Sequence, residues 1–450
     1  MNRPTTTLMK RTILILLLLL LGAFAARAQL RLTLDEALRL ALSENPTIRV
    51  AEMEVERYDY VKRQTWGALL PQVSVSGQLN HNFIVQQMSK GFSLGNDPYT
   101  TVSGAVDASL PLFAPQVYRM LRLNAAQMAS AVEAARASRI DLVAEVKKAF
   151  YNILLAEQSL AVLHESEATV RRTVEDTQLQ YDHGLASEYD LLTAEVQLSN
   201  LRPAILQTET SIRLAKLLLK MYLSIPEEVE IEAAGELDAL RGEVLAGTDG
   251  LTSDLGENSD LRQLELQEEM LRLQLRAENA GRLPTLGAFG NFTLTGNNMG
   301  TVKFDMAGGG MSSIKDGYFW QHPLYAGVRL SVPLFAGLVK ANRARELRNQ
   351  IAQIALQRDY ARQQLDVQLR SALNDLMTAR ETMFAQEKTV AQARKAYRIS
   401  DTRYRAGAGT ILELNSAQLA QTQAQLNYSQ AIYDYLSAKA EYDRLIGREE

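Results

Sequence analysis

The chain of 450 residues contains no cysteine. This absence excludes disulfide bonds, thiolate metal ligands, a cysteine nucleophile and lipid attachment to an N-terminal cysteine. Histidine is almost as scarce, because the sequence has only four, at His81, His164, His183 and His322. None of them has a partner at the spacing that a metal or catalytic site needs. We therefore expect no metal, no cofactor and no enzyme activity.

Long apolar runs are also missing, with one exception near the start of the chain. Ile13–Leu21 is an unbroken apolar run that follows Lys10 and Arg11, and the A-x-A pattern at residues 26–28 comes next. This order is typical of a secretory signal peptide, so we expect export and cleavage after Ala28. The remaining sequence has no run suited to a transmembrane helix. Membrane entry would then require a β-barrel.

An excess of positive charge is absent as well. Residues 1–28 contain four basic and no acidic side chains, so the remainder has 44 basic against 52 acidic residues and a formal charge of −8. This balance argues against nucleic acid as a partner. It fits an exported protein that is kept soluble by its charge.

The sequence repeats itself once. Three motifs of the first half return in the second half at nearly constant separations. One structural unit has therefore been used twice, and we expect repeat 1 at 29–223, a linking patch at 224–257 and repeat 2 at 258–450. The motif pairs are SENPTIR from Ser43 and GENSDLR from Gly256, 213 positions apart; SLPLFAP from Ser109 and SVPLFAG from Ser331, 222 apart; and YDHGLASEYDLLTAE from Tyr181 and YRAGAGTILELNSAQ from Tyr404, 223 apart.

Each repeat contains one very long helical segment. Residues 116–182 and 338–406 contain no proline or glycine, and their apolar positions recur at spacings of three and four. At 1.5 Å per residue such a helix is about 100 Å long, and the composition is typical of coiled coils. Shorter helices are predicted at 33–67, 187–222, 259–281 and 410–445. The shorter ones would stack end to end beside each long helix.

Each repeat also contains two segments in which apolar and polar residues alternate. They lie at about 72–84, 100–113, 285–296 and 320–335, with a turn at Gly296–Gly317 between the last two. Alternation predicts strands with one apolar face, and their length suits a tilted strand in a bilayer. A soluble sandwich is the alternative, but no other strands are present to cover the apolar faces.

Four strands are too few for a closed transmembrane barrel, because the smallest have eight. Open sheet edges in lipid leave backbone groups unpaired, so the membrane interpretation requires several copies of the chain. Two copies supply eight strands, and three supply twelve and leave room for a lumen. A soluble periplasmic coiled-coil scaffold without transport activity is the alternative for the whole protein.

The long helices reverse direction at two glycine-containing turns. Gly184 and Gly407 relax the chain there, and Ser187 and Thr410 follow at N-cap positions of the returning helices. Because the two turns belong to equivalent parts of the repeat, we expect them side by side at one end of the protein.

These features together resemble the outer-membrane efflux protein family, the TolC-like channel-tunnels. The resemblance rests on Asn45-Pro46, the Leu-Pro pairs before the first strand of each repeat, the PLF motifs and the Y-x-x-G-x-x-[ST] turns. It covers Leu32 to about Gly447. Each motif is weak alone, but their order, repeated twice, is specific.

The resemblance implies a mostly α-helical homotrimer with a twelve-stranded barrel in the outer membrane of a Gram-negative cell and a twelve-helix periplasmic tunnel. It implies a passive exit duct for efflux or type I secretion. The partners would be a periplasmic adaptor, an inner-membrane transporter of the RND, ABC or MFS type and outer-membrane lipid. Drug or metal efflux and protein secretion stay open, since the pump selects the cargo. The loops Gln86–Pro98 and Asn297–Phe319 would face the exterior.

The resemblance also assigns roles to residues at the two turns. Contact with the adaptor is expected from the turn residues Gly184, Leu185, Ala186, Ser187, Gly407, Ala408, Gly409 and Thr410. A periplasmic gate is expected from Asp190 and Tyr404 as a hydrogen-bonded pair and from Glu413 as an acidic ring residue. Two positions depart from the family pattern, because Ser416 replaces a second acidic residue and Gly409 replaces a basic one. An equally weighted alternative for Asp190 and Glu413 is a simple favourable contact with the helix dipole.

Overall fold

The computed structural model describes residues 30–83, 99–242, 251–298, 302–306, 310–314, 318–335 and 337–449. The predicted signal peptide at residues 1–28 and the loop Gln86–Pro98 lie outside these ranges. The chain forms two compact units. Unit 1 comprises Met1–Met53, Val132–Gln263 and Asp359–Glu450, and unit 2 comprises Glu54–Ala131 and Leu264–Arg358. Each unit contains segments of both predicted repeats.

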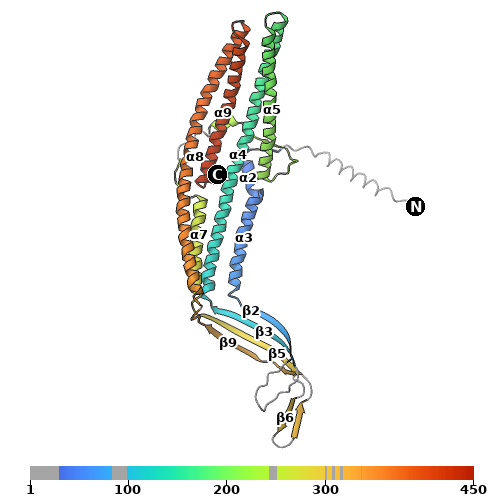
Figure 1. Cartoon of the computed structure of the whole chain (residues 1–450), viewed down its shortest axis with the longest axis vertical. Coiled ribbons are helices and arrows are strands. Elements are labelled where there is room, and N and C mark those ends of the chain that lie inside the picture. The colour runs from blue at the N-terminus through green and yellow to red at the C-terminus, as the bar shows by residue number, and fades with distance from the viewer. Residues whose placement is uncertain are drawn as a thin grey trace, which may run out of the picture. The chain divides into compact units, whose positions relative to one another are not determined.

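Four long helices dominate unit 1 (Figure 1). They are α4 (Pro115–Asp182), α5 (Glu188–Leu223), α8 (Val339–Arg405) and α9 (Ile411–Leu445), and the first parts of α4 and α8 belong to unit 2. The absence of glycine and proline from α4 after its first residue, and from all of α8, lets each helix continue for more than 65 residues. No helix among the described residues is both long enough and apolar enough to cross a membrane.

In unit 1, α8 packs against α9, α9 packs against α4, and α4 packs against α5. Leu365 and Leu369 of α8 share a buried cluster with Tyr442 of α9. The hydroxyl groups of Ser166 on α4 and Thr422 on α9 are 2.9 Å apart. Lys216 on α5 forms an ion pair of 2.8 Å with a glutamate on α4. Near the turns, α5 also contacts α9, and α8 also contacts α4.

The core of unit 1 lies where α4, α5 and α9 meet the short elements of the chain. Its fully buried side chains include Phe150 and Ile153 of α4, Leu219 of α5 and Tyr435 of α9. The strand β1 (Leu30–Leu32) pairs in parallel with β4 (Ile231–Ala233), and the 3-10 helix η1 (Leu237–Leu240) follows. Leu237 is buried in the same core cluster, so the described part of the segment predicted as a linking patch packs onto the helices.

The predicted helix at 33–67 is in fact two helices, α2 (Leu34–Glu44) and α3 (Pro46–Gly67). Thr33 and Glu36 form the expected capping box at the start of α2. The break lies at Asn45, whose backbone is extended with ψ of 127°. Proline disfavours helical backbone at the preceding residue and has no N–H of its own, so Pro46 ends one helix and begins the next.

Asn45 also joins the new helix to the end of α5. Its Nδ2 donates to the backbone oxygen of Tyr222 at 2.8 Å, and its Oδ1 accepts from the backbone N–H of Thr47 at 2.8 Å. A helix leaves its last carbonyl groups and its first N–H groups without internal partners. One buried side chain therefore satisfies both helix ends where α5 meets α3.

The same joint occurs in the second repeat. Asn258 precedes α7 (Ser259–Ala280), donates from Nδ2 to the backbone oxygen of Leu445 at 2.8 Å and accepts from the N–H of Leu261 at 3.1 Å. Arg136 reinforces this joint, since its guanidinium donates to the backbone oxygens of Glu257 and Gly447. We call these two sites the asparagine joints.

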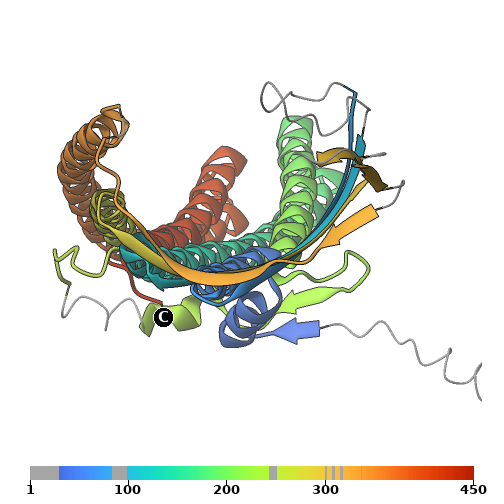
Figure 2. The same ribbon diagram turned by 90° about the horizontal axis from the view of Figure 1, so that it is seen from below.

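The main sheet of unit 2 is antiparallel and curved (Figure 2). The order is β2, β3, β5, with β8 and β9 pairing successive parts of the other edge of β5. The register repeats, because Gln72 pairs with Ser109 and the equivalent Thr285 pairs with Ser331. The bounds are β2 (Gln72–Asn82), β3 (Tyr99–Phe113), β5 (Thr285–Asn298), β8 (Tyr318–Gln321) and β9 (Leu324–Ser331).

This register places the apolar residues of all four long strands on one face. Val75 pairs with Val106, Val106 pairs with Phe292, and Phe292 pairs with Leu324. The face is uncovered in the single chain, since Val75 is 79% exposed and Leu324 is 77% exposed. Alternation in the sequence therefore leads to a sheet with one open apolar face.

Two details of the predicted second strand pair are wrong. The strand expected at 320–335 is interrupted after β8 and ends at Ser331, because Pro323 and Pro333 supply no N–H to a ladder. The glycine-rich stretch expected to be a turn contains a hairpin of β6 (Val302–Met306) and β7 (Gly310–Ile314). In β6, apolar residues alternate with Lys303 and Asp305, which favours a strand.

Candidate functional site

The turn between α4 and α5 is built from local interactions. Gly184 has φ of 74°, a left-handed conformation that glycine adopts without steric cost. The N–H of Gly184 donates to the oxygen of Tyr181 at 2.9 Å, and that of Leu185 donates to the oxygen of Gln180 at 2.7 Å. Ser187 and Asp190 then form a capping box that starts α5.

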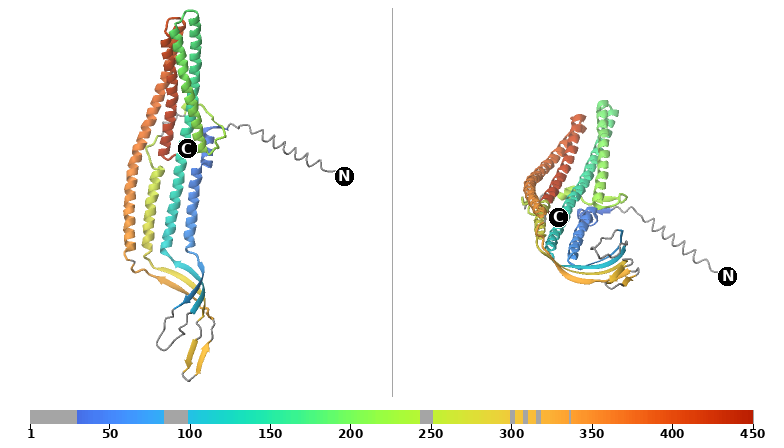
Figure 3. Two further views of the ribbon diagram at one scale, coloured as in Figure 1. Left: turned by 45° about the vertical axis from the view of Figure 1, so that its right-hand side comes forward. Right: turned by 60° about the horizontal axis from the view of Figure 1, so that its bottom comes forward.

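The turn between α8 and α9 has the same backbone. Gly407 has φ of 68°, and its N–H donates to the oxygen of Tyr404 at 2.9 Å. The N–H of Ala408 donates to the oxygen of Arg403 at 2.8 Å, and Thr410 caps α9 by accepting from the N–H of Glu413 at 3.2 Å. Both turns lie at the same end of unit 1 (Figure 3), as expected for equivalent parts of a repeat.

The residues predicted to dock a partner lie on these turns and are mostly exposed. Leu185 projects with 79% of its surface accessible. Next to the turns, the first parts of α5 and α9 form a shallow groove of about 480 Å³. Its apolar lining is exposed and consists of Tyr189, Leu192, Val196, Leu412 and Leu419.

The predicted gate residues have partners other than those expected. The hydroxyl groups of Tyr404 and Thr177 are 2.9 Å apart, which links α8 to α4. The Asp190 carboxylate instead accepts from the N–H of Ser187 at 3.1 Å and from its hydroxyl at 2.7 Å. The structure therefore does not bring Tyr404 and Asp190 together within the chain.

Glu413 lies at the position equivalent to Asp190 but has a different environment. Its carboxylate is 3.5 Å from Nη1 of Arg403, whose Nη2 donates to the oxygen of Ala408 at 3.1 Å. A side chain at Gly409 would crowd Arg403, because a Cβ there would lie 3.2 Å from the Arg403 Cβ and 3.2 Å from the Tyr404 nitrogen. The basic group near this turn thus comes from Arg403 on α8.

Thr177, Arg403 and the apolar groove were not predicted from the sequence. Thr177 is fully buried, and its signal was its place exactly one helical turn before Tyr181, on the same face. Arg403 could have been found as the basic residue directly before Tyr404 in the sequence. The groove could have been found from the apolar residues that recur at spacings of three and four near the starts of α5 and α9.

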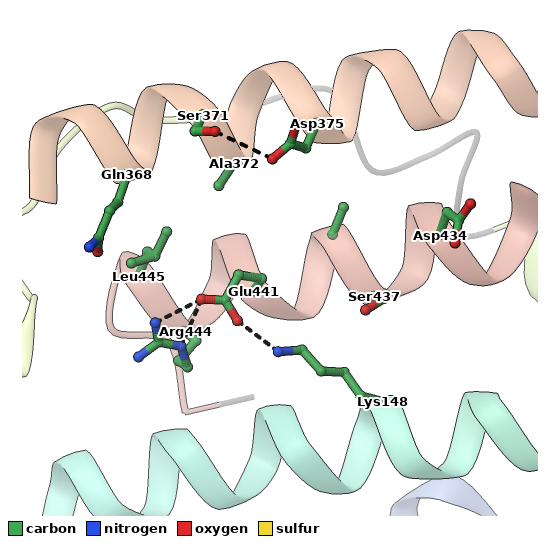
Figure 4. Close-up of a pocket in the computed structure, with 11 residues that line it drawn as sticks. Lys148, Gln368, Ser371, Ala372, Asp375, Asp434, Ser437, Glu441, Arg444 and Leu445 are labelled. Carbon is green, nitrogen blue, oxygen red and sulfur yellow. Dashed lines mark hydrogen bonds and ion pairs between the residues drawn. The ribbon is translucent and has the colours of Figure 1, made fainter.

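A second groove, of about 570 Å³, lies farther along α8 and α9 (Figure 4). Glu441 is its central group and accepts from Lys148 Nζ at 2.7 Å and from Arg444 Nη2 at 2.7 Å. Burial raises the pKa of Glu441, but these hydrogen bonds lower it by more, so its pKa lies below the usual 4.5. The ionised carboxylate holds α4 and α9 together at this level.

Among the described residues, no cluster of three or more histidine, aspartate or glutamate side chains is arranged to hold a metal ion. The features that unit 1 does show are two matched turns, buried hydroxyl contacts between helices and the asparagine joints. In unit 2 the corresponding feature is a sheet with one open apolar face.

Comparison with known proteins decides the family. The sequence model of a family described as "Outer membrane efflux protein" matches residues 37–223 and 251–448. The protein belongs to the outer membrane efflux protein family. The two matched segments together contain most of the described helices and strands.

Relatives of the chain include a protease secretion protein and an outer membrane protein. The chain is 25% identical to the alkaline protease secretion protein AprF of Pseudomonas aeruginosa over 412 residues, which cover 90% of this chain and 82% of AprF. It is 22% identical to the outer membrane protein TolC of Vibrio cholerae over 388 residues, covering 84% of this chain and 82% of TolC.

The fold agrees with a solved member of the family. The structure of CusC superimposes with a TM-score of 0.71 and 16% sequence identity, covering 92% of each chain. The mostly helical architecture with a smaller sheet is thus that of a TolC-like channel-tunnel. Family members are outer-membrane channel proteins of Gram-negative bacteria and are not enzymes, which places this protein in the outer membrane.

Proposed function

We propose that the protein is the outer-membrane exit duct of a tripartite efflux or type I secretion system. Three copies would form a twelve-stranded barrel and a twelve-helix periplasmic tunnel. Substrates would pass passively from an inner-membrane transporter of the RND, ABC or MFS type, through a periplasmic adaptor, to the exterior. The observation that carries this proposal is family membership over both halves of the chain.

The sheet of unit 2 supports assembly from several copies. Within the chain, β2 pairs with β3 alone and β9 pairs with β5 alone, so one side of each strand has no strand partner among the described residues. Unpaired backbone groups are costly in lipid, where no water replaces the missing hydrogen bonds. Pairing β9 of one copy with β2 of the next would satisfy both edges and place the apolar face toward lipid.

The two turns support a docking role. Their backbones match, they lie together at one end of unit 1, and the exposed groove beside them offers apolar surface to a partner. A helical hairpin of an adaptor would bury such a groove through residues spaced three and four apart. The gate role of Asp190, Tyr404 and Glu413 forms part of the same proposal, since all three lie within two helical turns of the docking residues.

In-cell photocrosslinking tests the proposal. A photoreactive amino acid would replace Ser187 or Thr410, with Glu228, an exposed residue in the linking patch, as the control position. We expect Ser187 and Thr410, but not Glu228, to capture an adaptor whose loss also abolishes export through the associated pump. Self-crosslinks alone, from protein that is correctly located in the outer membrane, would contradict the docking role.

A further inference from the structure

The main sheet of unit 2 carries few charged side chains. On its strands β2, β3, β5, β8 and β9, the charged residues other than histidine are Asp107 and Arg329. Asp107 accepts a hydrogen bond of 2.6 Å from Nδ2 of Asn291. Arg329 forms no ion pair or hydrogen bond through its side chain with the part of the chain that the structure describes. One positive charge on the sheet therefore has no acidic partner among these residues.

The strand register places Arg329 on the face opposite to the apolar one. Val328 is four residues from Leu324 and so lies on the apolar face, and Arg329 comes directly after it. Phe289 pairs with Gly327, two residues before Arg329, so Phe289 and Arg329 share the opposite face. Lipid that covered the apolar face would not reach the Arg329 side chain.

Arg329 also lies near one particular end of the sheet, the end at which the strands join helices. There β2 follows α3, β3 leads into α4, β5 follows α7 and β9 leads into α8 (Figure 1). The helix segments next to the strands belong to unit 2. Arg329 is two residues from the end of β9, and Gln72, the first residue of β2, is joined to Phe289 through Ser109 in the pairing register. In the proposed barrel this end is the mouth that faces the periplasmic tunnel.

An aromatic ring supports the Arg329 side chain. The guanidinium carbon of Arg329 lies 4.9 Å from the centroid of the Phe289 ring, within the range of a cation–π interaction. The ring in turn lies over Gly327, where an added Cβ would be 3.0 Å from the Phe289 Cζ. Tyr325 meets Phe289 edge-on, with centroids 6.3 Å apart. The guanidinium is thus placed by ring contacts, which leave its N–H groups available to an acceptor.

A groove of about 330 Å³ lies beside this stack. Arg329, Gln72 and Ser109 line it, and each can donate a hydrogen bond from a side chain that has no such partner among the described residues. Phe289 and Pro111 contribute apolar lining. None of the described residues that line the groove is acidic. The groove therefore combines one positive charge, three donor side chains and an apolar wall.

This combination fits an organic anion. A guanidinium offers a fork of N–H groups that binds two oxygens of a carboxylate or a similar group, and such charge-assisted hydrogen bonds are stronger than neutral ones. The amide of Gln72 and the hydroxyl of Ser109 can donate to the same oxygens. An apolar ring attached to the anionic group would contact Phe289 and Pro111. A cation finds no acidic group in the groove.

We propose that the groove beside Arg329 binds organic anions, with the Arg329 guanidinium holding a carboxylate or sulfonate and Phe289 contacting an attached apolar ring. The inference rests on the proposed function, in which copies of Arg329 form a ring at the inner mouth of the barrel. Substrates with a negative charge would bind there as they pass. Such binding is weak, because a site in a duct must also release what it binds.

Photoaffinity labelling of the purified exported protein in detergent tests the site. The probe is para-benzoylbenzoate, which carries a carboxylate on a photoreactive aromatic ketone. Mass spectrometry locates the label, and its dependence on probe concentration gives an apparent Kd. We expect label on the peptides that contain Ser109, Phe289 or Arg329.

Substitutions at Arg329 test the role of its charge. Arg329→Gln keeps a polar side chain but removes the charge, so we expect the apparent Kd to rise about tenfold with the loss of charge-assisted hydrogen bonds. Arg329→Lys keeps the charge without the fork and should give an intermediate value. Arg348→Gln is the matched control and should label like the wild type, because Arg348 is exposed on α8 and does not line the groove.

Two further controls separate charge from apolar adhesion. The neutral probe para-benzoylbenzamide should label the groove weakly and should respond little to Arg329→Gln. Phe289→Leu should weaken labelling by both probes but preserve the preference for the carboxylate, because Arg329 is still present. Circular dichroism of each variant verifies that it is folded.

The inference is overturned if the folded Arg329→Gln variant labels like the wild type, if the amide probe labels the groove as well as the carboxylate does, or if the label lies only on other parts of the chain. Export in cells is a separate readout for the proposed function. Cells that lack the protein and still export normally would contradict the duct alone, whereas the labelling results bear on the anion site alone.

Discussion

The asparagine joint of the second repeat leads to a quantitative prediction. In Asn258→Ala, the backbone oxygen of Leu445 and the N–H of Leu261 both lose their buried partner. An unsatisfied buried group costs about 1–3 kcal/mol, and loss of an N-cap alone costs about 1 kcal/mol. Because water partly replaces the side chain in the cavity, we expect about 3 kcal/mol for the pair.

This cost appears as local opening of the first turn of α7. A tenfold change in an equilibrium constant corresponds to 1.36 kcal/mol. Destabilising the closed state by about 3 kcal/mol therefore makes amide exchange through local opening roughly 100-fold faster. The assay is hydrogen–deuterium exchange with mass spectrometry on peptides that cover Asn258 to Leu261. Asn258→Ser keeps the cap but cannot reach Leu445, so we expect it to recover about 1 kcal/mol.

Matched variants make this prediction specific. Asn45→Ala is expected to open the first turn of α3 in the same way, because its contacts to Tyr222 and Thr47 are equivalent. Asn200→Ala, on the exposed surface of α5, should leave exchange unchanged. A change of less than about threefold in Asn258→Ala, well under 1 kcal/mol by the same conversion, would refute the view that the asparagine seals the joint.

Two further predictions concern stability, measured as the apparent melting temperature of the purified protein in detergent. Gly447→Ala should cost at least about 2 kcal/mol, because φ is 79° and the added Cβ would overlap the backbone of Glu257 across the joint. Gly242→Ala is the control and should be neutral, because a Cβ at that position meets nothing within 4 Å. Glu441→Gln should cost about 1 kcal/mol at neutral pH, because the side chain is one-third exposed. Burial raises the pKa of Glu441, but the hydrogen bonds from Arg444 and Lys148 lower it by more, so the folded-state pKa lies below the usual 4.5. The stabilisation is therefore present above pH 4.5 and is lost as the pH falls through the folded-state pKa. A wild-type advantage that persists well below that range would contradict this assignment.

Local features were well predicted from the sequence because short-range forces produce them. The capping box of Thr33 and Glu36, the left-handed Gly184 and Gly407, and the uninterrupted course of α4 follow from backbone sterics and helix-end chemistry. The single apolar face of the sheet follows from alternation with period two. The mostly helical fold was predicted correctly for the same reason, whereas the family was predicted correctly from the order of the repeated motifs.

Breaks inside these elements were harder to predict. Asn45-Pro46 was recognised as a motif, yet the helix was expected to continue through it. The joint forms only when the end of α5 lies opposite Asn45. The two residues that meet there, Asn45 and Tyr222, are 177 positions apart in the sequence. The same applies to β8 and β9, since a proline interrupts a strand only where its N–H would have been used in pairing.

The amino-acid sequence by itself determined the duplication, the helices, the strands and the two turns, because periodic burial and local backbone preferences act within a few residues. Only the tertiary structure decided which groups meet across helices. Tyr404 contacts Thr177 and not Asp190, and Glu413 meets Arg403, because helix rotation and register fix these distances. No local pattern encodes that rotation, since it depends on how all packed faces fit together.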